Sequence, residues 1–293
     1  MKNIALLLTT FILFSAAHAQ KINQEYDTDS KPYLWGEINK EGMQGPNYAS
    51  WFNKNFEDYT PNVDTIALLA KRLSEVKILA FMGTWCGDSK RQVPRFYKVL
   101  EATNYPLEQL TMIGVRRDRD YYKQGPNNEE AGLNIHRVPT FILYKNDKEI
   151  GRIIESPKTS IEGDLLQILN GNYTPNYPIV GHVDALLQQK GVRTIQKNKA
   201  KKMVKKWQEK VTSKYHLNTY AIVLNSAGQK EQAIAVMALN SLFFPNEAST
   251  FENLATIQEK AGYTNDALSN FKMALQLAPD SEKAQSGIAR LSE

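Results

Sequence analysis

The sequence has 293 residues, a net charge of +5 and 42% hydrophobic residues. This length exceeds one ordinary domain and predicts two, and the composition is that of a globular protein, with no segment after the N-terminus long and apolar enough to span a membrane. The single cysteine, Cys86, excludes an internal disulfide.

The first 19 residues resemble an export signal. Residues 1–3 form a basic start, residues 4–14 are apolar, and Ala17-His18-Ala19 is a small-x-small cleavage pattern. This is the order of a secretory signal peptide, and the apolar run is shorter than the roughly 20 residues that a spanning helix needs. We therefore expect cleavage near Ala19-Gln20 and an exported mature protein, either periplasmic or extracellular.

Residues 20–60 are polar but rich in aromatic side chains. The rings are Tyr26, Tyr33, Trp35, Tyr48, Trp51, Phe52, Phe56 and Tyr59. Such rings mostly supply buried area, so we expect an N-terminal extension that packs on the next domain. A ligand platform is the alternative.

Residues 61–171 alternate between helical and strand patterns. The expected elements are a helix over 63–74, a strand over 76–82, a helix over 90–103 interrupted by Pro94, a strand over 110–115, a hairpin of strands 140–144 and 149–154 around Asn146-Asp147, and a helix over 161–169. This alternation predicts an α/β domain in which helices cover a sheet.

The remainder reads as a linker followed by an all-α domain. Residues 172–181 contain helix-breaking prolines, and a helical pattern fills 182–293. A 34-residue period pairs Gly228 with Gly262, Ala233 with Ala267 and Pro245 with Pro279. This is the period and pattern of a tetratricopeptide (TPR) repeat. We expect units at 214–246 and 247–280, a capping helix over 281–292, and helices within 182–210 that extend the stack.

Two distant segments resemble the thioredoxin family. Residues 81–90, with Cys86 at their centre and Pro94 beyond, are similar to that family's active-site segment, and residues 135–146, with Val138-Pro139, are similar to its cis-proline strand. The resemblance covers about residues 60–170 and implies a thioredoxin-like fold. It implies that Cys86 is the nucleophile, that Pro139 shapes the groove opposite it, and that Trp85, Gly87, Asp88 and Val138 line the groove.

The residues themselves support a reactive sulfur at Cys86. A cysteine between a strand end and a helix start lies beside unpaired backbone N–H groups, which favour an anion, and the thiolate is the nucleophilic form. A hydrogen bond from Ser89 would favour it further. The exposed charge of Asp88 opposes it by only about 1 kcal/mol.

Two departures from the family limit the chemistry. Its second cysteine is replaced by Ser89, and its buried acid by Ala80. Cys86 therefore cannot complete a dithiol cycle alone. Two functions stay open: monothiol thiol–disulfide exchange with clients recruited by the TPR domain, in which Cys86, Ser89 and Pro139 form the site, or a redox-inactive adaptor that only binds proteins.

Other features predict little further chemistry. The histidines His136, His182 and His216 are dispersed and do not suggest a metal site, and we expect no cofactor. Lysines crowd residues 197–214, which predicts the solvated face of an amphipathic helix. An acidic protein or an anionic surface is the alternative partner there, while no motif that reads nucleic-acid bases accompanies the charge.

Overall fold

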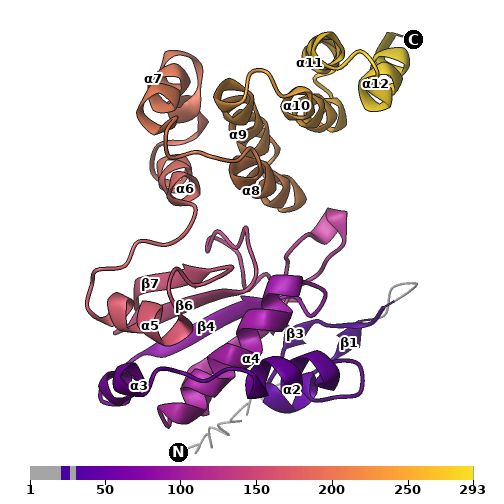
Figure 1. The fold of residues 1–293 in the computed structure, drawn as a ribbon. Helices are drawn as coiled ribbons and strands as arrows, with labels where there is room; N and C mark the ends of the chain where they lie inside the picture. The colour runs from indigo at the N-terminus through magenta and orange to yellow at the C-terminus, as the bar shows by residue number, and fades with distance from the viewer. Residues whose placement is uncertain (1–20, 27–30, 293) are drawn as a thin grey trace, which may run out of the picture.

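The computed structural model describes residues 21–26 and 31–292, and the expected signal peptide lies outside them. The described chain forms an α/β domain followed by a stack of helices, as the sequence predicts (Figure 1). In the described part of the chain, no helix is long and apolar enough to cross a membrane.

The α/β domain is built on a five-stranded sheet of order β3-β5-β4-β6-β7. Its strands are β3 (Gly36–Glu37), β4 (Lys77–Met82), β5 (Leu110–Gly114), β6 (Thr140–Lys145) and β7 (Lys148–Ile154). The β4–β5 pair is parallel and the other pairs are antiparallel. Asn146 and Asp147, which join β6 to β7, both have positive φ, as a tight hairpin turn requires.

The N-terminal extension packs on this domain, as expected, and adds elements that the sequence did not indicate. These are a ribbon of β1 (Glu25–Tyr26) and β2 (Tyr33–Leu34), the edge strand β3, and the helices α1 (Lys40–Met43) and α2 (Ala49–Glu57). Strands of two residues are too short to carry a periodic pattern. The side chains of Tyr33, Tyr48 and Phe52 are buried, so the extension supplies core rather than an open ring platform.

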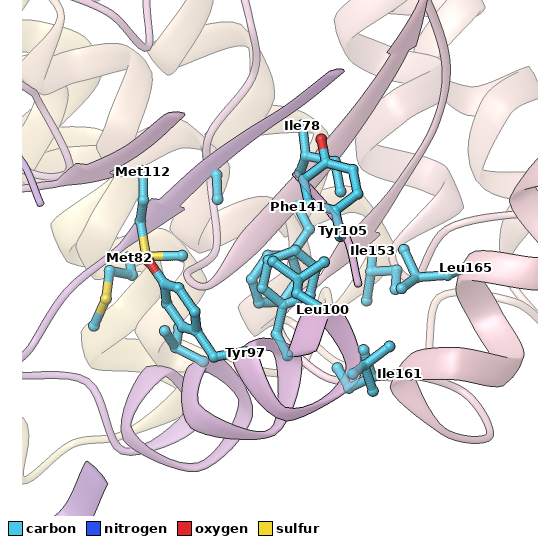
Figure 2. Packing of buried hydrophobic residues seen from close by; sticks show 14 of the residues in the cluster. Ile78, Met82, Tyr97, Leu100, Tyr105, Met112, Phe141, Ile153, Ile161 and Leu165 are labelled. Carbon is cyan, nitrogen blue, oxygen red and sulfur yellow. The ribbon is translucent and has the colours of Figure 1, made fainter. Parts of the chain in front are cut away.

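Four helices cover one face of the sheet. Besides α2 they are α3 (Val63–Leu69), α4 (Gly87–Ala102) and α5 (Ile161–Leu169), with a 3₁₀ turn η1 (Leu73–Glu75) after α3. Figure 2 shows part of this core, in which Leu100 of α4 and Leu165 of α5 lie in one cluster with Phe141 of β6. Phe96 of α4 stacks on Phe141, with 4.2 Å between ring centroids. The helix α4 begins three residues earlier than predicted, at Gly87, and continues past Pro94.

Among residues 21–26 and 31–292, no such layer of helices covers the opposite face. It is covered by residues 115–139, the connection from β5 to β6, in which the 3₁₀ turn η3 (Arg119–Tyr121) is the one regular element. A separate apolar cluster forms here from Phe81, Ile113, Val115, Ile135, Val138 and Ile142, with Trp85 and Cys86 packed against it. A second 3₁₀ turn, η2 (Leu107–Gln109), precedes β5.

The helical domain starts earlier than predicted. Its first helix, α6, spans Pro178–Lys190, so the linker ends at Tyr177 instead of residue 181. Proline at the first helical position explains the shift, because its fixed φ suits a helix start and its missing N–H costs nothing there.

The rest of this domain follows the predicted repeats. After η4 (Val192–Ile195) and α7 (Lys197–Trp207), the paired helices are α8 (Tyr215–Ser226) with α9 (Lys230–Phe243) and α10 (Ala248–Lys260) with α11 (Thr264–Leu277), followed by the capping helix α12 (Glu282–Ser292). Gly228 and Gly262, at equivalent places 34 residues apart, both have positive φ where α8 and α10 end. Helices α6 and α7 share one apolar core with α8 and α9, so they extend the stack.

Candidate thiol site at the start of α4

Cys86 lies where β4 gives way to α4. It is the N-cap residue of α4, with extended backbone angles, and its side chain is partly exposed. Its thiol donates a hydrogen bond to the Val138 carbonyl oxygen, with 3.3 Å between Sγ and O. The sulfur is thus held between the positive end of a helix, which favours the thiolate, and a carbonyl dipole, which favours the thiol.

The Val138–Pro139 peptide bond is cis, as the resemblance implied. Because Val138 itself accepts the hydrogen bond from Cys86, the two segments that the sequence analysis paired do face each other. Thr140, the next residue, starts β6, and its hydroxyl donates to the Arg137 carbonyl oxygen at 2.7 Å. This bond ties the cis-proline segment to the sheet.

The residues around Cys86 are held by contacts within the domain. Ser89 is fully buried, and its Oγ accepts a hydrogen bond from the Gly83 N–H at 3.2 Å. A Cβ added at Gly83 would lie 2.4 Å from Cε2 of Trp85, so glycine is required there. The role of Ser89 as a donor to the thiolate stays a prediction, because the observed bond uses its oxygen as an acceptor.

Trp85 forms one wall of the site. Its indole N–H donates to the Val115 carbonyl oxygen at 2.9 Å, and its ring packs against Tyr122 at 6.0 Å between centroids. Gly87, the first residue of α4, is exposed. Asp88 forms an ion pair with Arg91 at 2.6 Å, which offsets part of its repulsion toward a thiolate.

The structure places a buried lysine near the sulfur that the sequence did not indicate. Lys123 is 3% exposed, and its ammonium group donates to the His136 carbonyl oxygen at 2.5 Å and lies 4.4 Å from the Tyr122 ring centroid. Burial lowers the pKa of Lys123 to about 7; the positive charge of Arg137 lowers it too, while the charges of Cys86 and Glu155 act in the opposite direction. No sequence pattern marked this lysine, which lies in a polar connection without periodicity.

His136 is also buried, and it lies at the contact with the helical domain. It is 1% exposed, and burial lowers its pKa to about 3. Its ring meets Tyr177 edge-on at 5.6 Å and Tyr220 of α8 at 6.2 Å between centroids. Arg137 donates to the Tyr215 carbonyl oxygen at 3.1 Å, so the residues before the cis-proline hold the two domains together.

The other predicted features lie apart from the sulfur. Ala80, at the place of the family's buried acid, is fully buried in the helix-covered core. His182 packs on Trp207 in the helical domain, and no group of side chains suited to a metal ion occurs among residues 21–26 and 31–292. Lys197, Lys199, Lys201, Lys202, Lys205 and Lys206 are exposed along α7, while Ala200 and Met203 are buried.

Comparisons with known proteins point to one family. The chain is 30% identical over 88 residues to thioredoxin-1 of Schizosaccharomyces pombe, covering 30% of this chain and 76% of that protein. It is 27% identical over 108 residues to the TPR repeat-containing thioredoxin TDX of Arabidopsis thaliana, which is 37% of this chain and 26% of that protein. It is 29% identical over 85 residues to mitochondrial thioredoxin-3 of Saccharomyces cerevisiae, which is 29% of this chain and 59% of that protein.

The matched stretch is therefore less than two thirds of the length of the latter two relatives. No protein-family model matches the chain.

Proposed function

Because this chain belongs to the thioredoxin family and carries a helical domain of TPR type, we propose that it is a monothiol thiol–disulfide exchange protein that acts on protein clients. The observation that carries the proposal is the position of Cys86. The sulfur is partly exposed at the N-terminus of α4 and faces the cis Val138–Pro139 segment.

The exchange has two balanced steps. The Cys86 thiolate attacks one sulfur of a client disulfide, a new S–S bond joins Cys86 to the client, and the other client sulfur leaves as a thiolate that takes a proton from solvent. A second thiolate, from the client or from an external thiol, then attacks the mixed disulfide and releases Cys86. Because Ser89 stands where a second cysteine would resolve the adduct, the mixed disulfide is long-lived.

Lys123 supports the reactive form of Cys86 in this proposal. Its charge interacts favourably with a negative Cys86, and its burial weakens screening by water. It acts as a positioning residue: it donates to the His136 carbonyl oxygen, two residues before the Val138 carbonyl that faces the sulfur. The support is strongest below pH 7, where Lys123 is charged.

The helical domain recruits the client, and the N-terminal residues direct export. Stacked helix pairs present a continuous surface suited to a protein segment. The charge pattern and cleavage site of residues 1–19 support a secretory signal peptide, and we place the mature protein in the periplasm or outside the cell.

A redox-inactive adaptor is the second candidate. It is favoured by the hydrogen bond from the Cys86 thiol to Val138, which stabilises the protonated sulfur, and by the replacement of the resolving cysteine. In that case the groove and the helical surface bind the same proteins without a covalent step.

The two candidates are separated by trapping client proteins in cells that express either the wild type or Cys86→Ala. We expect the wild type to carry partners in adducts that a reductant releases, and Cys86→Ala to carry none of these. Ser89→Cys is the matched variant: by restoring a resolving thiol it should shorten the lifetime of the adducts. Equal recovery of partners by wild type and Cys86→Ala, with no reducible species, would establish the adaptor instead.

A further inference from the structure

The two domains enclose a cleft of about 580 Å³ next to the thiol site. One wall is the connection between β5 and β6, which contributes Arg117, Arg119, Asp120 and Tyr122. The other wall is the helical domain, which contributes side chains from α8, α9, α10 and α12. The walls are joined beside the cleft by two hydrogen bonds: the Ser226 hydroxyl donates to the Arg119 carbonyl oxygen at 2.6 Å, and the Gln124 amide donates to the Ser226 carbonyl oxygen at 2.9 Å.

The lining of this cleft is strongly basic. Arg117, Arg119, Lys260 and Lys283 face a single acidic lining residue, Asp120. Lys283 is exposed, yet desolvation lowers its pKa. The negative charge of Glu252 opposes this shift, and the positive charge of Arg119 on the opposite wall adds to it. Two like charges thus repel each other across the cleft, and an anion between them would remove that repulsion.

Side chains that donate hydrogen bonds extend this basic lining along the helical domain. Asn218 of α8, Asn253 of α10 and Lys283 of α12 form a ladder, in which the Lys283 ammonium donates to Asn253 at 2.9 Å and the Asn253 amide donates to Asn218 at 2.8 Å. These donors come from the first helix of each repeat pair, α8 and α10, and from the capping helix α12. Donors spread over three helices and the opposite wall suit an extended chain that carries several carboxylates.

The cleft is also continuous with the rim of the thiol site. Tyr122 lines the cleft, and its ring packs against Trp85, the residue before Cys86. The negative charge of Cys86 and the desolvation of the ring both raise the pKa of Tyr122, with desolvation the larger cause. A segment bound in the cleft therefore has its chain end within reach of the Cys86 groove.

We propose that this interdomain cleft binds an extended acidic segment of the client and thereby presents a nearby client disulfide to Cys86. The inference rests on the proposed exchange function and adds the chemistry of the partner. Carboxylates of the segment pair with Arg119 and Lys283 and with the asparagine ladder. The exposed lysines of α7 line a different part of the helical domain and do not take part in this recognition.

The test uses the full chain and two short unstructured peptides. Each peptide carries one cysteine activated as a mixed disulfide with thionitrobenzoate, which absorbs light on release. One peptide is rich in Glu and Asp, and the other has Gln and Asn at those positions. We expect the wild type to react about tenfold faster with the acidic peptide at low salt, since two partly exposed charge pairs contribute that much, and to lose this preference at high salt.

The variant Arg119→Gln/Lys283→Gln should react equally with both peptides. The matched control is Lys201→Gln/Lys205→Gln on α7, which removes the same charge from exposed lysines and should keep the tenfold preference. Equal rates for both peptides with the wild type, or an equal loss of preference in the control, would overturn the cleft as the acidic site.

Two further measurements separate this inference from the proposed function. Dithiodipyridine, a small neutral disulfide, reports the reactivity of Cys86 alone and should react equally with the wild type and both double variants. Fluorescence anisotropy of the acidic peptide, made without its cysteine, reports binding to Cys86→Ala. If Cys86 does not react with dithiodipyridine, the exchange function is contradicted. The anisotropy measurement still decides whether the cleft prefers the acidic peptide.

Discussion

The two faces of the central sheet are built on different principles. One face is covered by α2, α3, α4 and α5 over a large apolar core (Figure 2). The other is covered by the irregular residues 115–139 over a small apolar cluster that reaches Trp85 and Cys86. On this second face Lys123 and His136 are buried, the Lys123 ammonium donates to the His136 carbonyl oxygen, and the His136 ring meets Tyr220 of the helical domain.

The helix-covered face therefore stabilises the domain, while the opposite face carries the candidate site. Packed apolar side chains are the main source of folding free energy, and they dominate the helix-covered face. On the face that carries the sulfur, desolvation lowers the pKa of buried Lys123 and buried His136, so charging either group costs free energy. On the helix-covered face, the buried carboxylates of Glu162 and Asp164 instead accept hydrogen bonds from Tyr59 and Tyr173. The two faces should therefore respond differently to substitution and to pH.

The largest effect is expected on the helix-covered face. Phe96 is fully buried and stacks on Phe141, so Phe96→Ala should lower the free energy of unfolding by about 4 kcal/mol through lost burial and a cavity. Chemical denaturation measures this. Leu107→Ala, at an exposed leucine, should change it by less than about 0.5 kcal/mol. Similar losses in both variants would mean that this face does not hold the main core.

A pH-dependent effect is expected at His136. Its pKa of about 3 in the folded protein lies below its ordinary value, so the unfolded chain binds a proton that the folded chain does not. Stability is therefore complete above about pH 6.5 and falls as the pH drops toward 3. His136→Phe keeps a ring against Tyr177 and Tyr220 and removes this loss.

Between pH 6.5 and 4.5 the wild type should lose about 2 kcal/mol more than His136→Phe does. Urea denaturation across this range measures the difference. Parallel curves for the two proteins would show that the imidazole becomes protonated without unfolding.

The same direction of pH dependence, in a higher pH window, is expected at Lys123. Its folded pKa of about 7 lies below its ordinary value, so its contribution is complete above about pH 10 and is lost as the pH falls toward 7. Between pH 9 and 7 the wild type should lose about 2 kcal/mol relative to Lys123→Met. The exposed Lys201→Met is the control and should follow the wild type; a Lys123→Met curve that does the same would mean that the ammonium is solvated.

The elements of the helix-covered face could be predicted from the sequence more completely than those of the opposite face. Helical periodicity and apolar runs indicated β4, β5, the β6–β7 hairpin, α3, α4 and α5, and the 34-residue period located α8 to α12. These signals exist because regular elements repeat their contacts. The two-residue strands β1 to β3 and residues 115–134 of the connection repeat nothing, so neither they nor their packing could be predicted.

The residues of the candidate site, too, were only partly predictable from the sequence. Cys86 and the cis Val138–Pro139 bond follow from a local motif, and the structure places them face to face. Lys123 and the basic interdomain cleft arise from tertiary packing of polar residues that look solvent-exposed in the sequence. The predicted linker ended four residues too late. Pro178 was interpreted as a helix breaker, but it is the first residue of α6.

The most direct test of the central claim is the rate at which iodoacetamide alkylates Cys86, the single cysteine of the chain, compared with a free cysteine in an unstructured peptide at pH 7. The account predicts faster alkylation of Cys86, and a slower rate in Lys123→Met than in the wild type. A wild-type rate equal to or below that of the free cysteine would contradict it, because the sulfur would then be held as the thiol by Val138.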